Sequence, residues 1–141
     1  MKDNSLIGTW KLKSFEWRAS DGSVIYPFGR DVLGYLIFSP EGYFSATLSA
    51  ANRKKFTSQD LIGGSLEEKA GATELYLSYC GPCEIEKDKF RTRVEISLIP
   101  NWVGGYQERY YKIDGKTLSV RSTPMLFGGK EQVAYLIFER V

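Results

Sequence analysis

Histidine is absent from the 141-residue sequence, and cysteine occurs only twice. The missing histidine removes the most common general base, the most common zinc ligand and the usual pH switch near neutrality. Without it the chain has no Ser-His-Asp or Cys-His arrangement, and two thiols are too few for a closed zinc site. We therefore expect neither a catalytic triad nor a metal centre, and no cofactor.

Long apolar runs and blocks of like charge are missing as well. No segment approaches the roughly 18 consecutive apolar residues of a membrane span, and no hydrophobic signal core follows the first residues. The 19 basic and 17 acidic residues are mixed along the chain and leave a formal charge of +2. We expect a cytoplasmic protein with no membrane span and no nucleic-acid partner.

Aromatic residues and glycine are abundant instead. Aromatic residues make up 14% of the sequence, and 14 glycines separate short apolar runs, which favours β-structure. Alternation and turn signals predict eight strands, at 8–18, 34–39, 43–50, 79–86, 90–99, 106–113, 117–123 and 132–140. Ser65 and Glu68 form a capping-box pattern, which predicts one helix between residues 52 and 78, with Leu66, Ala70, Thr73 and Leu77 at helical spacing.

Strict alternation also assigns side chains to faces of the sheet. In the first strand it places Trp10, Leu12 and Ser14 on one face and Phe15 and Trp17 on the other. The hairpin at 34–50 has a common buried face, formed by Leu36, Phe38, Phe44, Ala46 and Leu48. In the strand at 90–99 we expect Val94 and Ile96 to belong to the core.

The order of elements is three strands, one helix and five strands joined by short turns. Strands joined by hairpins tend to be neighbours, and eight twisted strands close into a barrel without exposed edges. The pattern predicts an all-β domain over residues 1–141, an eight-stranded antiparallel barrel with one short helix. An open sandwich is the alternative.

Several short motifs follow one another in order along the chain. Gly8-Thr9-Trp10 heads the first strand and Glu139-Arg140 ends the last; between them come Tyr26-Pro27-Phe28-Gly29, the block Ile99-Pro100-Asn101-Trp102-Val103-Gly104, Gln107-x-Arg109-Tyr110 and Ile113-Asp114-Gly115-x-x-Leu118. The combination resembles the lipocalin-like domain family of bacteria and fungi. The resemblance implies a lipocalin-like barrel with a helix near one mouth and an arginine, Arg140, packed across Trp10. It implies no particular reaction, and a histidine common in the family is missing from 90–97.

Cys80 and Cys83 stand in the sequence Cys-Gly-Pro-Cys, the motif of thioredoxin-type redox centres. That chemistry needs the first cysteine at a helix N-terminus, where the thiol pKa is lowered. Here a short charged segment and a turn follow the motif. In the resemblance the segment corresponds to the start of an ordinary strand. We interpret the two thiols as structural.

The strands on either side of Trp102 carry the most interesting polar side chains. In 106–113, Gln107 and Arg109 alternate with Glu108 and Tyr110, so one of the two rows faces the interior. A charge inside a barrel needs a partner of opposite charge. If Glu95 points inward, we expect it to form an ion pair with an inward Arg109 or Arg93. The candidate ligand-binding residues are Tyr35, Phe38, Phe44, Tyr79, Glu95, Trp102, Gln107 and Arg109. In the alternative interpretation, the polar members form salt bridges on the outer face.

Three functions fit these observations. The first is a module that binds a small lipophilic molecule inside the barrel. The second is a cyclase or isomerase of secondary metabolism, which holds a flexible apolar substrate and uses Glu95, Arg109 or a tyrosine as an acid or donor. The third is a structural or partner-binding domain with a filled core. A homodimer is compatible with all three. Met125 and Phe127, before the last strand, are candidates for a lid.

Overall fold

The computed structural model describes residues 4–141 and contains all eight predicted strands. After the short 3-10 helix η1 (Asn4–Leu6) the elements are β1 (Gly8–Ala19), β2 (Val24–Ile25), β3 (Val32–Phe38), β4 (Tyr43–Ala50), α1 (Leu66–Glu74), β5 (Tyr76–Ile85), β6 (Lys89–Arg93), β7 (Ile96–Ser97), the 3-10 helix η2 (Pro100–Trp102), β8 (Tyr106–Asp114), β9 (Thr117–Ser122), β10 (Met125–Phe127) and β11 (Lys130–Arg140). The strands β2 and β10 are short additions that the sequence pattern did not indicate.

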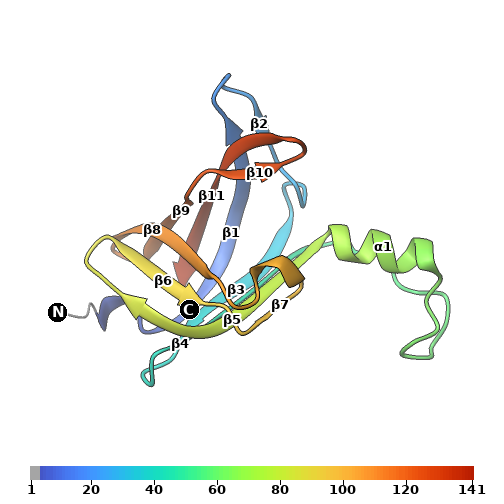
Figure 1. Cartoon of the computed structure of the whole chain (residues 1–141), viewed down its shortest axis with the longest axis horizontal. Coiled ribbons are helices and arrows are strands. Elements are labelled where there is room, and N and C mark those ends of the chain that lie inside the picture. The colour runs from blue at the N-terminus through green and yellow to red at the C-terminus, as the bar shows by residue number, and fades with distance from the viewer. Residues whose placement is uncertain (1–3) are drawn as a thin grey trace.

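Eight antiparallel strands form a closed ring (Figure 1). Its order is β1-β11-β9-β8-β6-β5-β4-β3, and the pairing of β3 with β1 completes it. Most neighbours are joined by short turns, which is why they pair with each other. The ring confirms the predicted barrel and replaces the sandwich alternative, because β1 and β11 have partners on both sides.

A β-bulge in β1 corrects the predicted faces of that strand. The pairing with β11 shifts register between Leu12 and Ser14, so one residue is left over there. As a result Trp10, Leu12, Phe15 and Trp17 are all buried on the same face. Strict alternation placed Phe15 and Trp17 on the opposite face, and this was wrong because a bulge reverses the order of faces beyond it.

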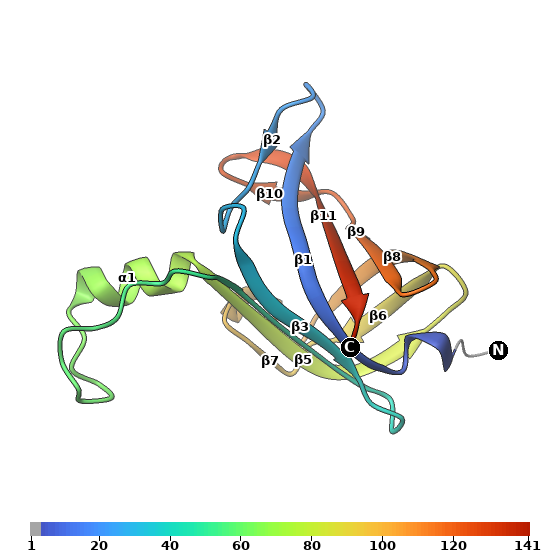
Figure 2. The same cartoon turned by 180° about the vertical axis from the view of Figure 1, so that it is seen from behind.

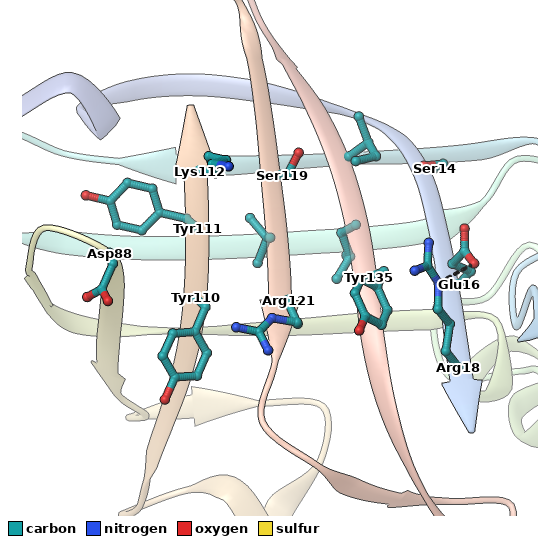
Figure 3. A pocket seen from close by; sticks show the side chains of 13 residues that line it. Ser14, Glu16, Arg18, Asp88, Tyr110, Tyr111, Lys112, Ser119, Arg121 and Tyr135 are labelled. Atoms are coloured by element: carbon teal, nitrogen blue, oxygen red, sulfur yellow. Dashed lines mark hydrogen bonds and ion pairs between the residues drawn. The ribbon is translucent and has the colours of Figure 1, made fainter. Parts of the chain in front are cut away.

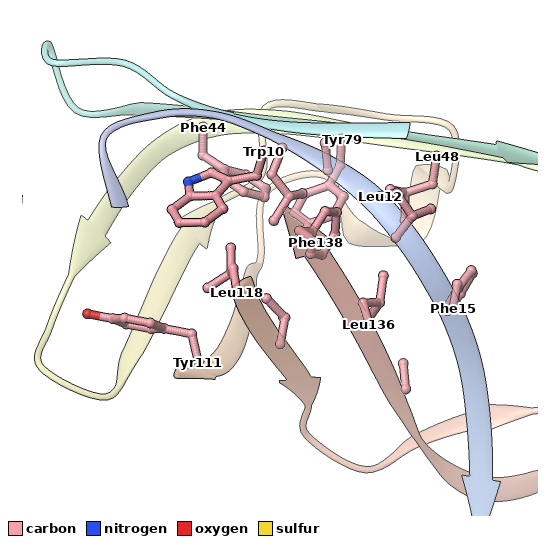
Figure 4. Close-up of a cluster of buried hydrophobic side chains, with 14 of the residues drawn as sticks. Trp10, Leu12, Phe15, Phe44, Leu48, Tyr79, Tyr111, Leu118, Leu136 and Phe138 are labelled. Atoms are coloured by element: carbon pink, nitrogen blue, oxygen red, sulfur yellow. The ribbon is translucent and has the colours of Figure 1, made fainter. Parts of the chain in front are cut away.

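The hairpin of β3 and β4 confirms the predicted buried face. Phe38 and Phe44 are partners in the ladder, and their ring centroids lie 4.9 Å apart. They join an interior cluster that includes the buried side chains of β1, β9 and β11 (Figure 4). The largest of its fully buried members are Trp10, Phe38, Phe44, Phe90 and Phe138. The core thus combines aliphatic side chains with aromatic rings that meet at tilted and edge-to-face angles along the inside of the ring of strands.

The predicted strand at 90–99 divides into two short strands. β6 ends at Arg93, and the N–H groups of Val94 and Glu95 bond to carbonyls on different segments, Gly105 and Cys80. Beyond this break Ile96 lies opposite Cys80 in β7 and is 67% exposed. Val94 is buried as expected, whereas the core assignment of Ile96 was wrong because the break reverses the faces.

The capping box at Ser65 and Glu68 is present and begins α1. The helix nevertheless has no buried residue, and Leu66 is 88% exposed. Together with the loop before it, α1 extends away from the ring in both views (Figures 1 and 2). Leu77, predicted as the last member of its apolar stripe, belongs to β5 instead. Within residues 4–141, no helix is long and apolar enough to cross a membrane.

Candidate ligand site inside the ring of strands

One end of the ring is sealed. The guanidinium carbon of Arg140 lies 4.0 Å from the centroid of the Trp10 ring, and Arg140 donates to the backbone carbonyls of Ile7 and Ser5. The Trp10 indole donates to the carbonyl of Leu6 at 3.0 Å. The N-terminal turn therefore lies against the base of the ring and closes this end of it.

An apolar pocket lies above this sealed end, between the middle of the ring and its open mouth. Its volume is about 50 Å³. Sixteen side chains line it: Phe15, Trp17, Leu36, Phe44, Ala46, Leu48, Leu77, Tyr79, Phe90, Trp102, Arg109, Val120, Met125, Ala134, Leu136 and Phe138. Most are aliphatic or aromatic, and no carboxylate is among them. Small-molecule sites have this composition, with a few placed polar groups in an apolar wall.

Aromatic pairs shape the wall and the mouth of the pocket. The Tyr79 and Trp102 rings meet edge to face, with centroids 5.3 Å apart. On the other side Trp17 stacks on Phe127 at 4.8 Å and an interplanar angle of 15°. Trp102 is the last residue of the 3-10 helix η2. The pocket is thus bordered by two aromatic pairs from distant parts of the sequence.

Arg109 is the one charged side chain in the lining. It is 8% exposed, and its guanidinium carbon lies 5.8 Å from the Tyr79 ring centroid and 5.9 Å from that of Trp102. Its hydrogen bond runs from one terminal nitrogen to the carbonyl of Glu108 at 3.0 Å. Burial raises the pKa of the Tyr79 phenol, and the Arg109 charge opposes part of this rise. Tyr79 is therefore a neutral hydrogen-bonding group beside a cation.

The structure brings together half of the predicted site residues. Phe44, Tyr79, Trp102 and Arg109 line the pocket. Phe38 is buried deeper in the core, and Gln107 is half-buried on β8 opposite Thr92. Tyr35, 44% exposed, and Glu95 both lie on the outside of the ring.

The expected pairing of Glu95 with Arg109 does not form. Glu95 follows the break after β6, where the chain leaves the regular ladder, and its side chain is exposed; Arg93 is exposed too. Sequence reasoning also missed Trp17, Leu77 and Ala134 as lining residues. The only sequence feature that pointed to Trp17 was its position two residues after Phe15, which puts both on the same face. Which face this is depends on the bulge, and the sequence pattern did not predict the bulge. Met125, predicted for a lid, does line the pocket.

Cys80 and Cys83 are free thiols on β5. Burial raises the pKa of Cys83 to about 11, the reverse of what an attacking redox thiol requires. The site of the motif within a strand also lacks a helix N-terminus. In the part of the chain that the structure describes, no group of three potential metal ligands comes together.

A wider hollow of about 390 Å³ lies on the outer face of β1, β11, β9 and β8 (Figure 3). Tyr110, Arg121 and Tyr135 are neighbours in one cross-strand row there. Arg18 pairs with Glu16 at 2.9 Å and packs on the Tyr135 ring. These side chains are solvent-accessible, and such surface pairs contribute little to stability. The alternative prediction placed Glu95, Gln107 and Arg109 in salt bridges on the outer face. None of the three lines this hollow and Arg109 is buried in the interior, so the interior pocket is the better candidate site.

A family model and known proteins are similar to this chain. The model of the lipocalin-like domain family matches residues 7–141. The chain is 30% identical over 106 residues to the 4'-hydroxy-3'-methoxypropiophenone carrier protein ppsC of Aspergillus oryzae, a match that covers 69% of this chain and 96% of that protein. A lipocalin-like protein from Bacteroides uniformis has 14% identity and a TM-score of 0.48, with coverage of 96% of this chain and 98% of its own. The family match spans nearly every residue that the structure describes, and the chain belongs to the lipocalin-like domain family.

Proposed function

We propose that this protein binds a small lipophilic molecule in the interior pocket and acts as a carrier for it. The observation that supports this most directly is the pocket itself, an aromatic and aliphatic lining that surrounds one buried cation inside a ring of strands sealed at its base. The Aspergillus oryzae relative is named as a carrier of an aryl ketone. A molecule of that class, an aromatic ring with oxygen substituents from secondary metabolism, suits this lining.

The pocket must widen to admit such a molecule. Its volume of about 50 Å³ is below the ~300–1,000 Å³ of typical ligand sites. Met125 lies in the short strand β10 at the mouth, and methionine is unbranched and changes rotamer easily. Two glycines with positive φ, Gly128 and Gly129, follow β10 directly. We propose that β10 and its turn move outward when the ligand enters.

The cyclase or isomerase alternative has less support from this geometry. Of the groups named for it, Glu95 lies outside the ring, whereas Arg109 and one tyrosine, Tyr79, line the pocket. No carboxylate lines the pocket, so Tyr79 and Arg109 are its only ionisable groups. A carrier needs no proton donor of its own.

The test is a fluorescence titration with 4'-hydroxy-3'-methoxypropiophenone, read from the tryptophan emission because Trp17 and Trp102 line the pocket. We expect saturable quenching by the ketone and a rise in melting temperature. Native mass spectrometry of the undenatured protein tests for a co-purifying molecule of the same class.

A filling substitution separates interior from surface binding. Ala134→Leu places three extra carbons in the pocket and should weaken binding at least tenfold, whereas Ile137→Leu, on the outer face of the same strand, should not change it. No quenching, no thermal shift and no co-purifying molecule would contradict the proposal and favour a filled structural domain.

A further inference from the structure

We infer that the ligand of this pocket is an anion, an aromatic molecule whose carboxylate or phenolate oxygen pairs with Arg109. The inference rests on the proposed function and names the chemical class of the ligand. The Arg109 side chain is more than nine-tenths buried, lines the pocket and carries a full positive charge.

Arg109 has no counter-charge. The ion pairs between residues 4 and 141 are Arg18–Glu16, Lys89–Glu108 and Lys130–Asp21, all with partly exposed side chains, and none involves Arg109. Although Glu108 is its neighbour in sequence, that carboxylate points to the opposite face of β8 and pairs with Lys89 at 3.7 Å. One terminal nitrogen of the guanidinium donates to the Glu108 carbonyl, and the Tyr79 hydroxyl is a neutral hydrogen-bonding neighbour; neither supplies a negative charge.

A buried charge without a partner is unfavourable, and proteins normally pair it. The Tyr79 and Trp102 rings give only part of the compensation, because both centroids lie close to the ~6 Å limit of a cation–π contact. An anionic oxygen from the ligand would complete it. The planar fork of arginine suits a carboxylate especially well, since two parallel hydrogen bonds form.

The remaining polar atoms of the lining favour the same sign of charge. Trp17, three strands away around the ring, has a buried indole N–H without a hydrogen-bond partner. An indole N–H is only a donor, and a guanidinium is only a donor. The Tyr79 hydroxyl can donate or accept, and with no carboxylate in the lining the one full charge that the pocket presents is positive. The lining therefore favours acceptor oxygens over a cationic group.

The experiment compares probes that share a skeleton and differ in charge. Cinnamate and methyl cinnamate are titrated into the protein and into Arg109→Leu, Arg109→Lys and Arg121→Leu variants. We expect the native protein to prefer cinnamate by about 10- to 100-fold, the range of a charge-assisted hydrogen bond. Arg109→Leu should remove the preference and keep the affinity for the ester. Arg121→Leu, on the outer face, should leave both unchanged.

A phenol probe distinguishes the two sources of the anionic oxygen. 4-Nitrophenol changes its absorption spectrum on ionisation, so the spectrum of the bound form reports whether the pocket holds the phenolate. Selective binding of cinnamate alone assigns the carboxylate class. A phenolate spectrum of the bound probe at a pH below the pKa of free 4-nitrophenol assigns the phenolate class.

Two results would overturn the inference. The first is equal affinity for cinnamate and its ester in the native protein, and the second is an unchanged preference in Arg109→Leu. Either would leave the carrier proposal standing if the aryl ketone still binds. If Arg109→Leu does not fold, Arg109→Lys, which retains the charge but not the planar fork, is compared with the native protein instead. Failure of every probe, the ketone included, would overturn both.

Discussion

Arg140 covers the ring of Trp10 at 4.0 Å and joins the last strand to the first turn of the chain. The same guanidinium donates to the carbonyl of Ile7 at 3.1 Å and to that of Ser5. Trp10 in turn donates to Leu6. One side chain thus satisfies two carbonyls of the N-terminal turn and closes the base of the barrel over a fully buried indole.

Replacement of Arg140 by alanine should lower the free energy of unfolding by about 2–3 kcal/mol, through loss of the cation–π contact and the hydrogen bonds to the N-terminal turn. Urea denaturation measures this change. Arg121→Ala is the matched control, since Arg121 also packs on a tyrosine ring but on the outer face. Its effect should stay below about 1 kcal/mol. Equal effects of the two substitutions would show that Arg140 has no special role at the base.

Gly81 in β5 has no room for a side chain. An added Cβ would lie 1.9 Å from the carbonyl oxygen of Arg93, a backbone atom that cannot move away without disturbing the break after β6. We expect Gly81→Ala to destabilise the protein by about 3 kcal/mol or more, or to prevent folding.

Gly71→Ala is the opposite case and the control for Gly81→Ala. Gly71 lies within α1 with nothing within 4 Å of an added Cβ, and alanine favours a helix by about 1 kcal/mol over glycine. Thermal denaturation should therefore show no loss of stability. If Gly81→Ala is tolerated, β5 at Gly81 and the backbone carbonyl of Arg93 are farther apart in solution.

Cys83 should react slowly with alkylating reagents in the native state. With a pKa of about 11, about one molecule in a thousand carries the thiolate at pH 8. Its reactivity should rise with pH up to that value, because only the thiolate attacks. In a Cys80→Ser variant, mass spectrometry after iodoacetamide treatment would follow Cys83 alone, and unfolding in urea should accelerate the reaction. Rapid modification of the native protein at pH 8 would contradict the assigned burial.

Ser65→Ala should unfold α1 without unfolding the barrel. The substitution removes the capping bond from the Glu68 N–H to the Ser65 hydroxyl, which contributes about 1 kcal/mol to a helix. Because α1 has no buried residue, the ring does not depend on it. Hydrogen exchange should show lost protection at 66–74 and unchanged protection in β3 and β4. Ser119→Ala, on the outside of β9, is the control.

Local signals predicted the strands and the start of the helix well. The hairpin of β3 and β4, with Phe38 opposite Phe44, follows from alternation on both sides of a Pro-Glu-Gly turn. The Ser65–Glu68 box marks the first turn of α1 because both hydrogen bonds of the box lie within four residues. The strands β2 and β10 were not predicted because they are too short to show alternation of apolar and polar residues.

The candidate site was only half predictable. Arg109 and Trp102 were identified through their motif, and Tyr79 and Phe44 through their position in aromatic strands. Glu95 was expected inside the ring and lies outside it. The chain leaves the regular ladder at Val94, and beyond this residue the opposite set of side chains faces the core. Trp17 was assigned to the wrong face for the same kind of reason.

The sequence by itself determined the class of fold and the order of the strands along the chain, because alternation and turns act over short distances. The packing of Arg140 across Trp10 was implied by the family resemblance of the terminal motifs. The tertiary structure decided which side chains meet in the interior. A single extra residue, as at Leu12 and Ser14, reverses every face beyond it, and its place depends on how β11 pairs with β1. The burial of Arg109 without a carboxylate is a result of such pairings, and no segment of the chain contains that information alone.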